Sequence, residues 1–182
     1  MIKSSAFRNR RFYLRSKYNQ MNTKNDECCP KFYPERWDKI SHTWDKKTFI
    51  KESIPTFFHI PWPPMIGKKA TIMTKLKEDA GKIEANKEDA LFLFRDPSAF
   101  RSELFLSATG TVPNADNVTI SGKFISKVFV GGYNAIPKFI KEMDTYLGTQ
   151  HLKAKDYYVH YAYCPKCAQK YGNNYILLFA QV

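Results

Sequence analysis

Four cysteines carry the clearest chemical pattern in this sequence. Cys164 and Cys167 are separated by two residues, and this Cys-x2-Cys spacing presents two thiolates to one metal ion. One such pair leaves a tetrahedral zinc ion half coordinated, so Cys28 and Cys29 are candidates for the remaining ligands. The sequence therefore predicts a zinc site of all four cysteines, which ties the N-terminal part of the chain to its last hairpin.

Other interpretations of the cysteines stay open. Adjacent cysteines seldom both bind one ion, so Cys29 together with a water molecule or a histidine is an alternative ligand pair. A redox pair, a disulfide and thiols without any ligand also fit the pattern. A redox Cys-x2-Cys normally opens a long helix, whereas Gly172-Asn173-Asn174 ends any helix here within two turns. A disulfide-built scaffold is not expected, because nothing in the sequence marks the chain as secreted.

A run of tyrosines around His160 is the second candidate site. Alternate side chains of a strand over Asp156–Tyr163 point to opposite faces of the sheet. Tyr158 and His160 therefore share one face, and the other face holds the remaining tyrosines, Tyr157, Tyr161 and Tyr163. One face is expected to pack on helices and the other to line a cleft.

The composition favours a cleft for a flat or apolar ligand. Aromatic residues make up 15% of the chain, and phenol groups can both stack on a ligand and hydrogen-bond it. We expect a small-molecule ligand in a cleft lined by Trp62, Tyr133, Tyr158 and Tyr161. The competing interpretation is a sheet face filled with aromatic side chains for packing alone.

Glu103 and His160 are the candidate catalytic residues. Hydrolysis needs a base that activates water and an acid that protonates the leaving group. Glu103 at the start of a strand, with a tyrosine or His160, is the most economical pair. The alternative is a solvated Glu103 beside Arg101.

Several common catalytic motifs do not occur in the sequence. It contains no Gly-x-Ser-x-Gly elbow, no Gly-x4-Gly-Lys phosphate loop, no Gly-x-Gly-x-x-Gly and no His-Glu-x-x-His. Esterases of the elbow type, nucleotide hydrolases and dehydrogenases therefore lack support.

Two stretches, 47–112 and 117–182, repeat one order of elements: strand, helix, strand, strand. Apolar spacing and turn residues predict these elements over Thr48–Ile60, 67–85, Ala90–Arg95 and Glu103–Thr109, then over Val118–Val130, Ile136–Leu147, Asp156–Tyr163 and Tyr175–Val182. Asn134 is the expected N-cap of the second helix and Gly148 its end. The last strand is apolar on both faces, which predicts a central position under helices. We predict an α+β fold of duplicated β-α-β-β units, with an antiparallel sheet and two main helices around a cleft.

The N-terminal residues differ from the rest in charge. Residues 1–20 hold six of the 29 basic residues and no acid, which is half of the net charge of +12. We expect this segment to be poorly ordered. Three interpretations are open: a transit peptide, a basic arm that contacts nucleic acid or membrane, and a non-native extension before Met21. Residues 21–46 are expected to form an irregular lead-in held by Trp37 and Trp44.

Broad classes of partner follow from composition. No apolar run is long enough to cross a bilayer, so we expect no membrane partner and a cytoplasmic protein. Because half of the positive excess is confined to 1–20, nucleic acid is not the expected partner, although a basic-arm nucleic-acid binder stays a third hypothesis.

The stretch Ser121–Tyr133 and the helix expected after it resemble the GyrI-like small-molecule-binding domain. In that family a strand, a Gly-Pro-Tyr turn and an amphipathic helix follow one another. Gly132 stands where the turn usually has proline, and Val130 stands where glutamate is frequent. The resemblance implies the duplicated fold, which SOUL-like proteins share, and a cleft for a small apolar or aromatic molecule.

A closer resemblance is to uncharacterised bacterial proteins labelled hydrolases, and it runs from Cys28 to Val182. It rests on Cys28-Cys29-Pro30, Phe58-His59-Ile60-Pro61, Ser121-Gly122, Cys164-Pro165-Lys166-Cys167-Ala168 and Tyr171-Gly172. The resemblance implies a ligand-binding protein that can also hydrolyse its ligand. A zinc-stapled binding or interaction module without catalysis is the alternative.

Overall fold

A computed structural model describes residues 29–58, 60–61 and 63–182. Its elements are, in chain order, η1 (Pro34–Arg36), β1 (Ile40–Phe57), β2 (Ile60–Pro61), α2 (Pro63–Asp79), η2 (Lys87–Asp89), β3 (Phe92–Ser98), β4 (Arg101–Ser107), β5 (Asp116–Val130), η3 (Tyr133–Ala135), α3 (Ile136–Thr149), β6 (Asp156–Tyr161), α4 (Pro165–Tyr171) and β7 (Tyr175–Gln181). The N-terminal arm, residues 1–20, and residues 21–28 of the predicted lead-in lie outside the described residues.

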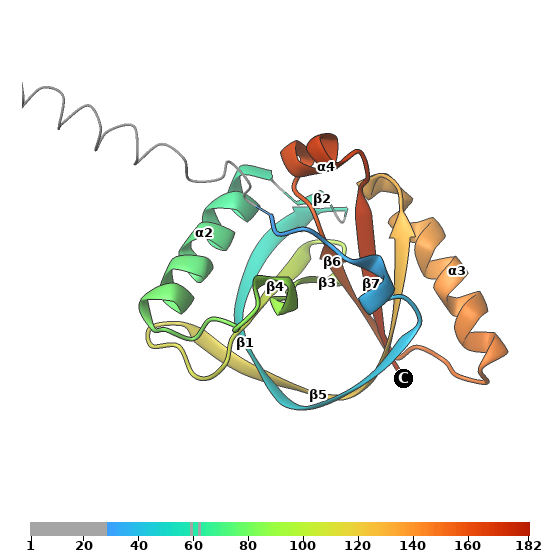
Figure 1. The fold of residues 1–182 in the computed structure, drawn as a ribbon, viewed down its shortest axis with the longest axis horizontal. Helices are drawn as coiled ribbons and strands as arrows, with labels where there is room; N and C mark the ends of the chain where they lie inside the picture. Colours follow the sequence, from blue (N-terminus) through green and yellow to red (C-terminus); the bar gives the residue numbers. More distant parts are fainter. Residues whose placement is uncertain (1–28, 59, 62) are drawn as a thin grey trace, which may run out of the picture.

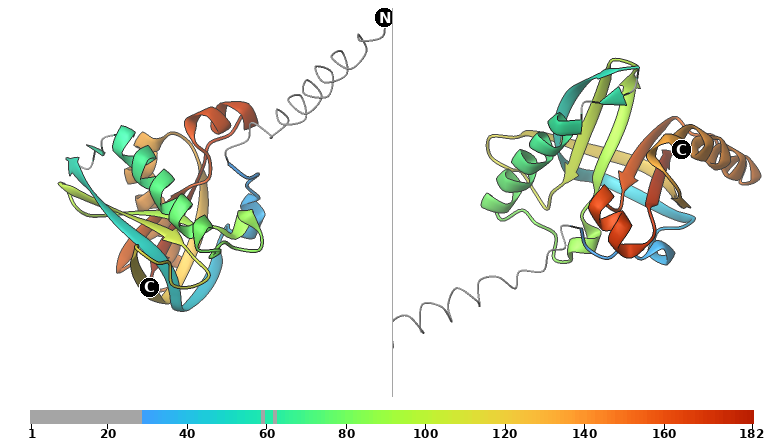
Figure 2. Two further views of the ribbon diagram at one scale, coloured as in Figure 1. Left: turned by 90° about the vertical axis from the view of Figure 1, so that its left-hand side faces the viewer. Right: turned by 90° about the horizontal axis from the view of Figure 1, so that it is seen from above.

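Six strands form a closed antiparallel barrel in the order β1-β4-β3-β6-β7-β5. The ring closes because β1 also pairs with β5, from Ile40 opposite Ser126 to Lys51 opposite Asp116. α2 and α3 lie on opposite sides of the barrel, and the short α4 lies at one end (Figure 1). The fold is therefore α+β, with its helices outside a closed sheet (Figure 2).

β1 begins at Ile40, earlier than the Thr48 that the sequence indicated. Its pairing with β5 shifts register between Trp44 and Lys47, and Lys46 has a φ of 48°. A bulge of this kind breaks the alternation of inward and outward side chains on which strand prediction depends. The sequence pattern therefore did not predict a strand before the bulge, although these residues form part of the barrel wall.

The ends of α3 also differ from the prediction. The chain enters α3 through η3, and Ala135 rather than Asn134 is the N-cap, without a side-chain hydrogen bond. Gly148 lies inside the helix, and His151 takes the left-handed φ of 55° just beyond its end. The apolar stripe that predicted α3 is confirmed, since Phe139, Met143 and Leu147 are its buried residues.

Aromatic and aliphatic side chains fill the inside of the barrel. They are Phe49, Leu91, Leu93, Phe105, Ile120, Phe124, Tyr158, Leu177 and Phe179. The indole ring of Trp44 lies 4.1 Å from the ring centre of Phe124 and 5.3 Å from that of Phe179. The residues before the bulge in β1 therefore contribute to the core as well as to the wall.

Two further clusters join the helices to the outside of the barrel. α3 packs through Phe139 and Met143 on the outward side chains of β7, and α2 packs through Met73 on β1 and β4. Five consecutive residues of β7, Ile176 to Ala180, are buried, alternating between the barrel interior and the α3 side. The predicted central position of this strand is confirmed. None of the helices in the described ranges is long and apolar enough to cross a membrane.

Replacing Phe179 with alanine is expected to lower the free energy of unfolding by about 3–5 kcal/mol, because it leaves a cavity inside a closed barrel. Phe57→Ala is the matched control, since Phe57 is 68% exposed, and its effect is expected to stay within about 0.5 kcal/mol. Urea unfolding of the full chain, followed by circular dichroism, measures both. Equal losses in the two variants would contradict this assignment of the core.

Candidate functional site

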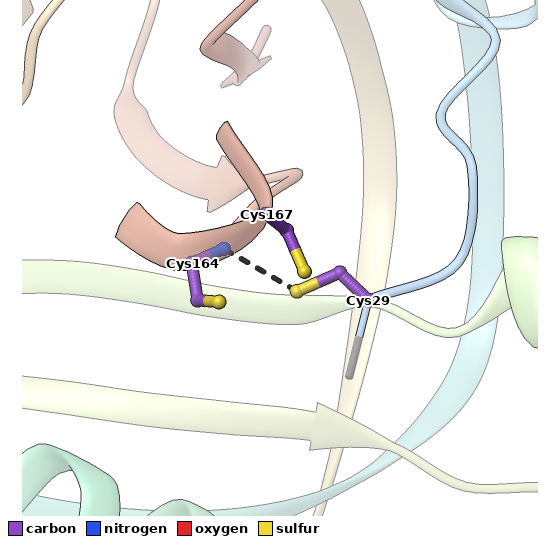
Figure 3. A group of neighbouring side chains, drawn as sticks. All are labelled: Cys29, Cys164 and Cys167. Atoms are coloured by element: carbon purple, nitrogen blue, oxygen red, sulfur yellow. Dashed lines mark hydrogen bonds between the residues drawn. The ribbon is translucent and has the colours of Figure 1, made fainter. Parts of the chain in front are cut away.

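Three cysteines from opposite ends of the chain meet beside α4. Cys164 is the N-cap of this seven-residue helix and Cys167 lies in its first turn, so both point to one side. Cys29 reaches them from the N-terminal segment (Figure 3). The three sulfur atoms lie within 4.8 Å of one another, and the Cys164 N–H donates to the Cys29 sulfur at 3.3 Å.

The cysteine cluster is held in place by tyrosines. Cys167 is buried, and Cys29 and Cys164 are half-buried against a small core that includes Tyr163. The N–H of Phe32 donates to the Tyr163 hydroxyl at 2.9 Å, which fixes the segment that carries Cys29. α4 then ends at Tyr171, and Gly172 has the left-handed φ of 72° expected from the sequence.

The donor set suits a soft divalent metal. Burial, together with hydrogen bonds to the two neighbouring thiols, raises the pKa of Cys29 well above its ordinary value. Without a cation the Cys29 thiol therefore keeps its proton, and a bound dication would favour the thiolate. Three of the four predicted metal ligands lie together in a group that can hold a metal ion. Cys28 lies outside the described residues.

A groove of about 490 Å³ lies between the cysteine segment and the end of α2. Cys29, Phe32, His160 and Ala162 line one side, and the residues on the other side include Lys77. The groove also contains the outer face of β3 at Phe92. It therefore connects the cysteine cluster with the surface described below.

His160 is a neutral group in this groove. Its Nδ1 lies 3.2 Å from both the N–H and the carbonyl oxygen of Phe92, so the tautomer decides which of the two it bonds. Burial lowers the pKa of His160 to about 4, and at neutral pH the ring is uncharged. Within the described part of the chain, no hydrogen bond engages its Nε2.

Four aromatic rings form a row on the outside of the β3–β6 seam, here called the outer aromatic row: Phe92, Phe94, Tyr161 and Tyr133. Successive ring centres are 5.1, 4.9 and 5.1 Å apart, all in edge-to-face contact. Phe92 and Phe94 belong to the cluster under α2, and Tyr161 belongs to the cluster under α3. The row therefore bridges the two helices, with Tyr133 exposed by 42%.

Both tyrosines of the row keep their protons at neutral pH. Burial, followed by the charge of Asp96 and the neighbouring Tyr133, raises the pKa of Tyr161 to about 12. Burial also raises the pKa of Tyr133, with a further contribution from Cys164. The Tyr133 hydroxyl donates to the Tyr163 carbonyl at 3.2 Å, so the row ends beside the cysteine cluster.

The predicted ligand-binding residues do not all share one surface. Tyr161 and Tyr133 are in contact in the outer row. Tyr158 lies on the other face of β6, inside the barrel, with its ring centre 5.8 Å from Phe105 and 6.0 Å from Phe124. Trp62 lies outside the described residues.

Glu103 is buried inside one end of the barrel rather than solvated. Its two carboxylate oxygens each lie 2.9 Å from a cation, Lys51 Nζ and an Arg95 guanidinium nitrogen, and Arg95 Nε is 2.5 Å from Asp156. Burial alone would raise the pKa of Glu103, but the hydrogen bonds from Lys51 and Arg95 lower it below its ordinary value. No contact among the described residues joins Glu103 to His160.

Sequence reasoning missed Phe92, Phe94 and Asp96. Phe92 and Phe94 are two positions apart in a short predicted strand, and this spacing indicates that both side chains lie on the same face of the sheet. Their partners Tyr161 and Tyr133 come from the other half of the chain, however, and only the pairing of β3 with β6 brings them together. The Ser102 hydroxyl donates to the carboxylate of Asp96, which ties this side chain of β3 to β4.

Comparison with known proteins gives a family and a fold. A family model described as bacterial hydrolase matches residues 19–182. A hydrolase from Listeria innocua has a similar structure, with a TM-score of 0.56 and 12% identity over 92% of this chain and 98% of that one. A Staphylococcus aureus MU50 protein provisionally assigned to transcription regulation has a TM-score of 0.43 and 14% identity over 80% of this chain and 99% of that one. No curated protein matches significantly.

Glu103→Gln is expected to lower the free energy of unfolding at pH 7 by about 3 kcal/mol, because it leaves two cations without their buried partner. Since the folded-state pKa is lowered, the contribution is complete above about pH 4.5 and disappears as the pH falls through the folded-state value. The exposed pair Lys138–Glu142 supplies the control, and Glu142→Gln should cost less than about 0.5 kcal/mol. Urea unfolding at several pH values measures the difference, and a pH-independent loss would contradict this assignment.

Proposed function

This chain belongs to the bacterial hydrolase family, and we propose that it binds a small apolar or aromatic molecule on the outer aromatic row and hydrolyses it there. The observation that carries the proposal is the row itself. Four rings in edge-to-face contact offer a continuous apolar surface, while two protonated phenols supply the polar groups that orient a ligand.

Asp96 and Tyr161 are the acid–base pair that we propose for the reaction. The Asp96 carboxylate accepts a proton from water as the water oxygen attacks the electrophilic carbon of the ligand. The Tyr161 hydroxyl donates a proton to the leaving group as the bond between that carbon and the leaving group breaks. The proton on Asp96 then returns to Tyr161 through solvent, so one water molecule is consumed. Asp96 follows Phe94 by two positions on β3, which supports placing its carboxylate on the face of the outer aromatic row.

We also propose that the two halves of the chain are copies of one unit, as in GyrI-like domains. The sheet runs β1-β4-β3 in the first half and β5-β7-β6 in the second, and each half contains one long helix. β3 then meets β6 at one seam and β1 meets β5 at the other. A ligand site at the β3–β6 seam would lie between equivalent strands, where both units contribute side chains.

A second proposal concerns the cysteines, which we assign to a zinc ion. The 4.8 Å grouping of Cys29, Cys164 and Cys167 supports it, because zinc takes thiolates in tetrahedral geometry. The ion would tie the N-terminal segment to α4 and could serve a binding module without catalysis. Thiolates of this kind persist in a reducing compartment, which supports the cytoplasm as the location.

Removing one ring from the row is expected to weaken the binding of an aromatic probe. For 1-naphthol, which has no ester bond to hydrolyse, we expect Phe94→Ala to raise the dissociation constant about tenfold, since aromatic contacts contribute about 0.5–1.5 kcal/mol each. Phe100→Ala removes a 60% exposed ring outside the row and is expected to change nothing. Equal affinities in all three proteins would exclude the row as the binding surface.

Hydrolysis of the corresponding ester, 1-naphthyl acetate, separates binding from catalysis. Tyr161→Phe and Asp96→Asn are each expected to lower kcat by about 10²-fold, with little change in binding. Tyr157→Phe is the matched control on the same face of β6, where the Tyr157 hydroxyl donates to Asp144 at 2.5 Å. Full turnover in both site variants would contradict the assignment of this acid–base pair, whereas no turnover in the unaltered protein would leave the chain a binding protein.

Zinc content tests the second proposal independently. We expect about one zinc per chain, lost in Cys29→Ser and Cys167→Ser. Metal removal is expected to lower the melting temperature, because binding free energy adds to folding free energy. Elemental analysis and calorimetry measure the two effects, and a metal-free protein with full stability would refute the assignment.

A further inference from the structure

The described residues supply three ligands to the proposed zinc ion. Cys29, Cys164 and Cys167 form the group, and no fourth histidine, cysteine, aspartate or glutamate in the described ranges joins it. A tetrahedral zinc with three protein ligands holds a water molecule or an external ligand in its fourth position. Cys28 is adjacent to Cys29 along the chain, and two neighbouring cysteines rarely reach the same ion.

The cluster faces an accessible space. Cys167 is only 1% exposed and forms the inner side, whereas Cys29 and Cys164 are half-buried. Cys29 also lines the groove of about 490 Å³. A volume of this size accepts a small molecule rather than water alone.

The aromatic part of the groove lining favours a flat ligand, and the charge of the metal site favours a neutral one. Rings of Phe32, Trp37 and His160 lie in it, and the Phe32 and His160 ring centres are 6.5 Å apart with planes 33° from parallel. Three thiolates around a dication carry a net charge of −1 in a half-buried place. A neutral ligand atom in the fourth position avoids adding a second negative charge there. Zinc accepts nitrogen as readily as sulfur.

We infer that the fourth position of the zinc is exchangeable, opens on this groove, and binds a neutral aromatic nitrogen heterocycle, with water in its absence. This inference rests on the proposed zinc site. It adds a ligand class and a place of binding that the outer aromatic row does not require. Because Phe92 contributes to both the groove and the row, such a ligand would lie at the end of the row.

Cobalt substitution in the full chain tests the inference, because Co²⁺ takes the place of zinc and its absorption reports the ligands. We expect thiolate-to-metal charge transfer from three sulfurs. Imidazole should then shift the ligand-field bands saturably at one equivalent per metal, without loss of charge-transfer intensity. Cobalt measured after desalting shows that the imidazole has bound the metal rather than removed it.

Two variants make the result decisive. Cys28→Ser is expected to leave the cobalt spectrum and the imidazole titration unchanged. Benzimidazole should bind more tightly than imidazole, and Phe32→Leu should reduce that preference by about three- to tenfold through the loss of ring contact.

The outcomes separate the two proposals. A spectrum that loses one thiolate in Cys28→Ser and does not respond to imidazole would show a closed four-cysteine site, which overturns the inference and keeps the zinc site. Failure of the protein to bind either cobalt or zinc would overturn the zinc site itself. A saturable imidazole shift, combined with a preference for benzimidazole that is absent or that Phe32→Leu leaves unchanged, would place the open position away from the groove and contradict the inference.

Discussion

The antiparallel pairing of β1 with β5 is the constraint on which the other features depend. It joins the first strand of the chain to the strand that opens the second half, and so turns a sheet into a ring. Closure removes both long sheet edges and fixes which side chains point inward. The same pairing holds the start of β1 in the barrel, and through it the segment that carries Cys29.

The alternation along the strands then separates two kinds of chemistry. On β6, Tyr158 points into a packed interior, and on β4, Glu103 lies in the ion network with Lys51 and Arg95 at one end of the barrel. Tyr161 points outward to the row between α2 and α3. An interior filled by aromatic rings leaves the outer surface as the place for a ligand, so the barrel acts as the scaffold of the proposed site.

Much of the fold follows from local pattern. The spacing of Phe139, Met143 and Leu147 predicted α3, and the apolar run of β7 predicted a strand buried on both faces. The Cys164–Cys167 spacing likewise indicated a site shared with the N-terminal segment, and Cys29 does lie there. These features are visible because each depends on residues close in sequence or on a spacing specific to one chemistry.

Other features depend on register, which a single sequence does not contain. The bulge after Trp44 breaks the alternation at the start of β1, and burial of Glu103 follows from its position between β1 and β3. Asp96 lies where the pairing of β3 with β4 is irregular, so the sequence pattern alone does not fix the direction of its side chain. The outer aromatic row needs partners from both halves of the chain, and non-local pairing alone supplies them.

Nuclear magnetic resonance of the labelled full chain, titrated with 1-naphthol, tests the central claim that the ligand binds outside the barrel. The account predicts saturable shifts at Phe92, Phe94, Tyr161 and Tyr133, because a bound ring changes the field over its neighbours. The inward signals of Leu93 and Leu177 should stay in place. Shifts confined to those interior residues, or none in the outer aromatic row at saturation, would contradict it.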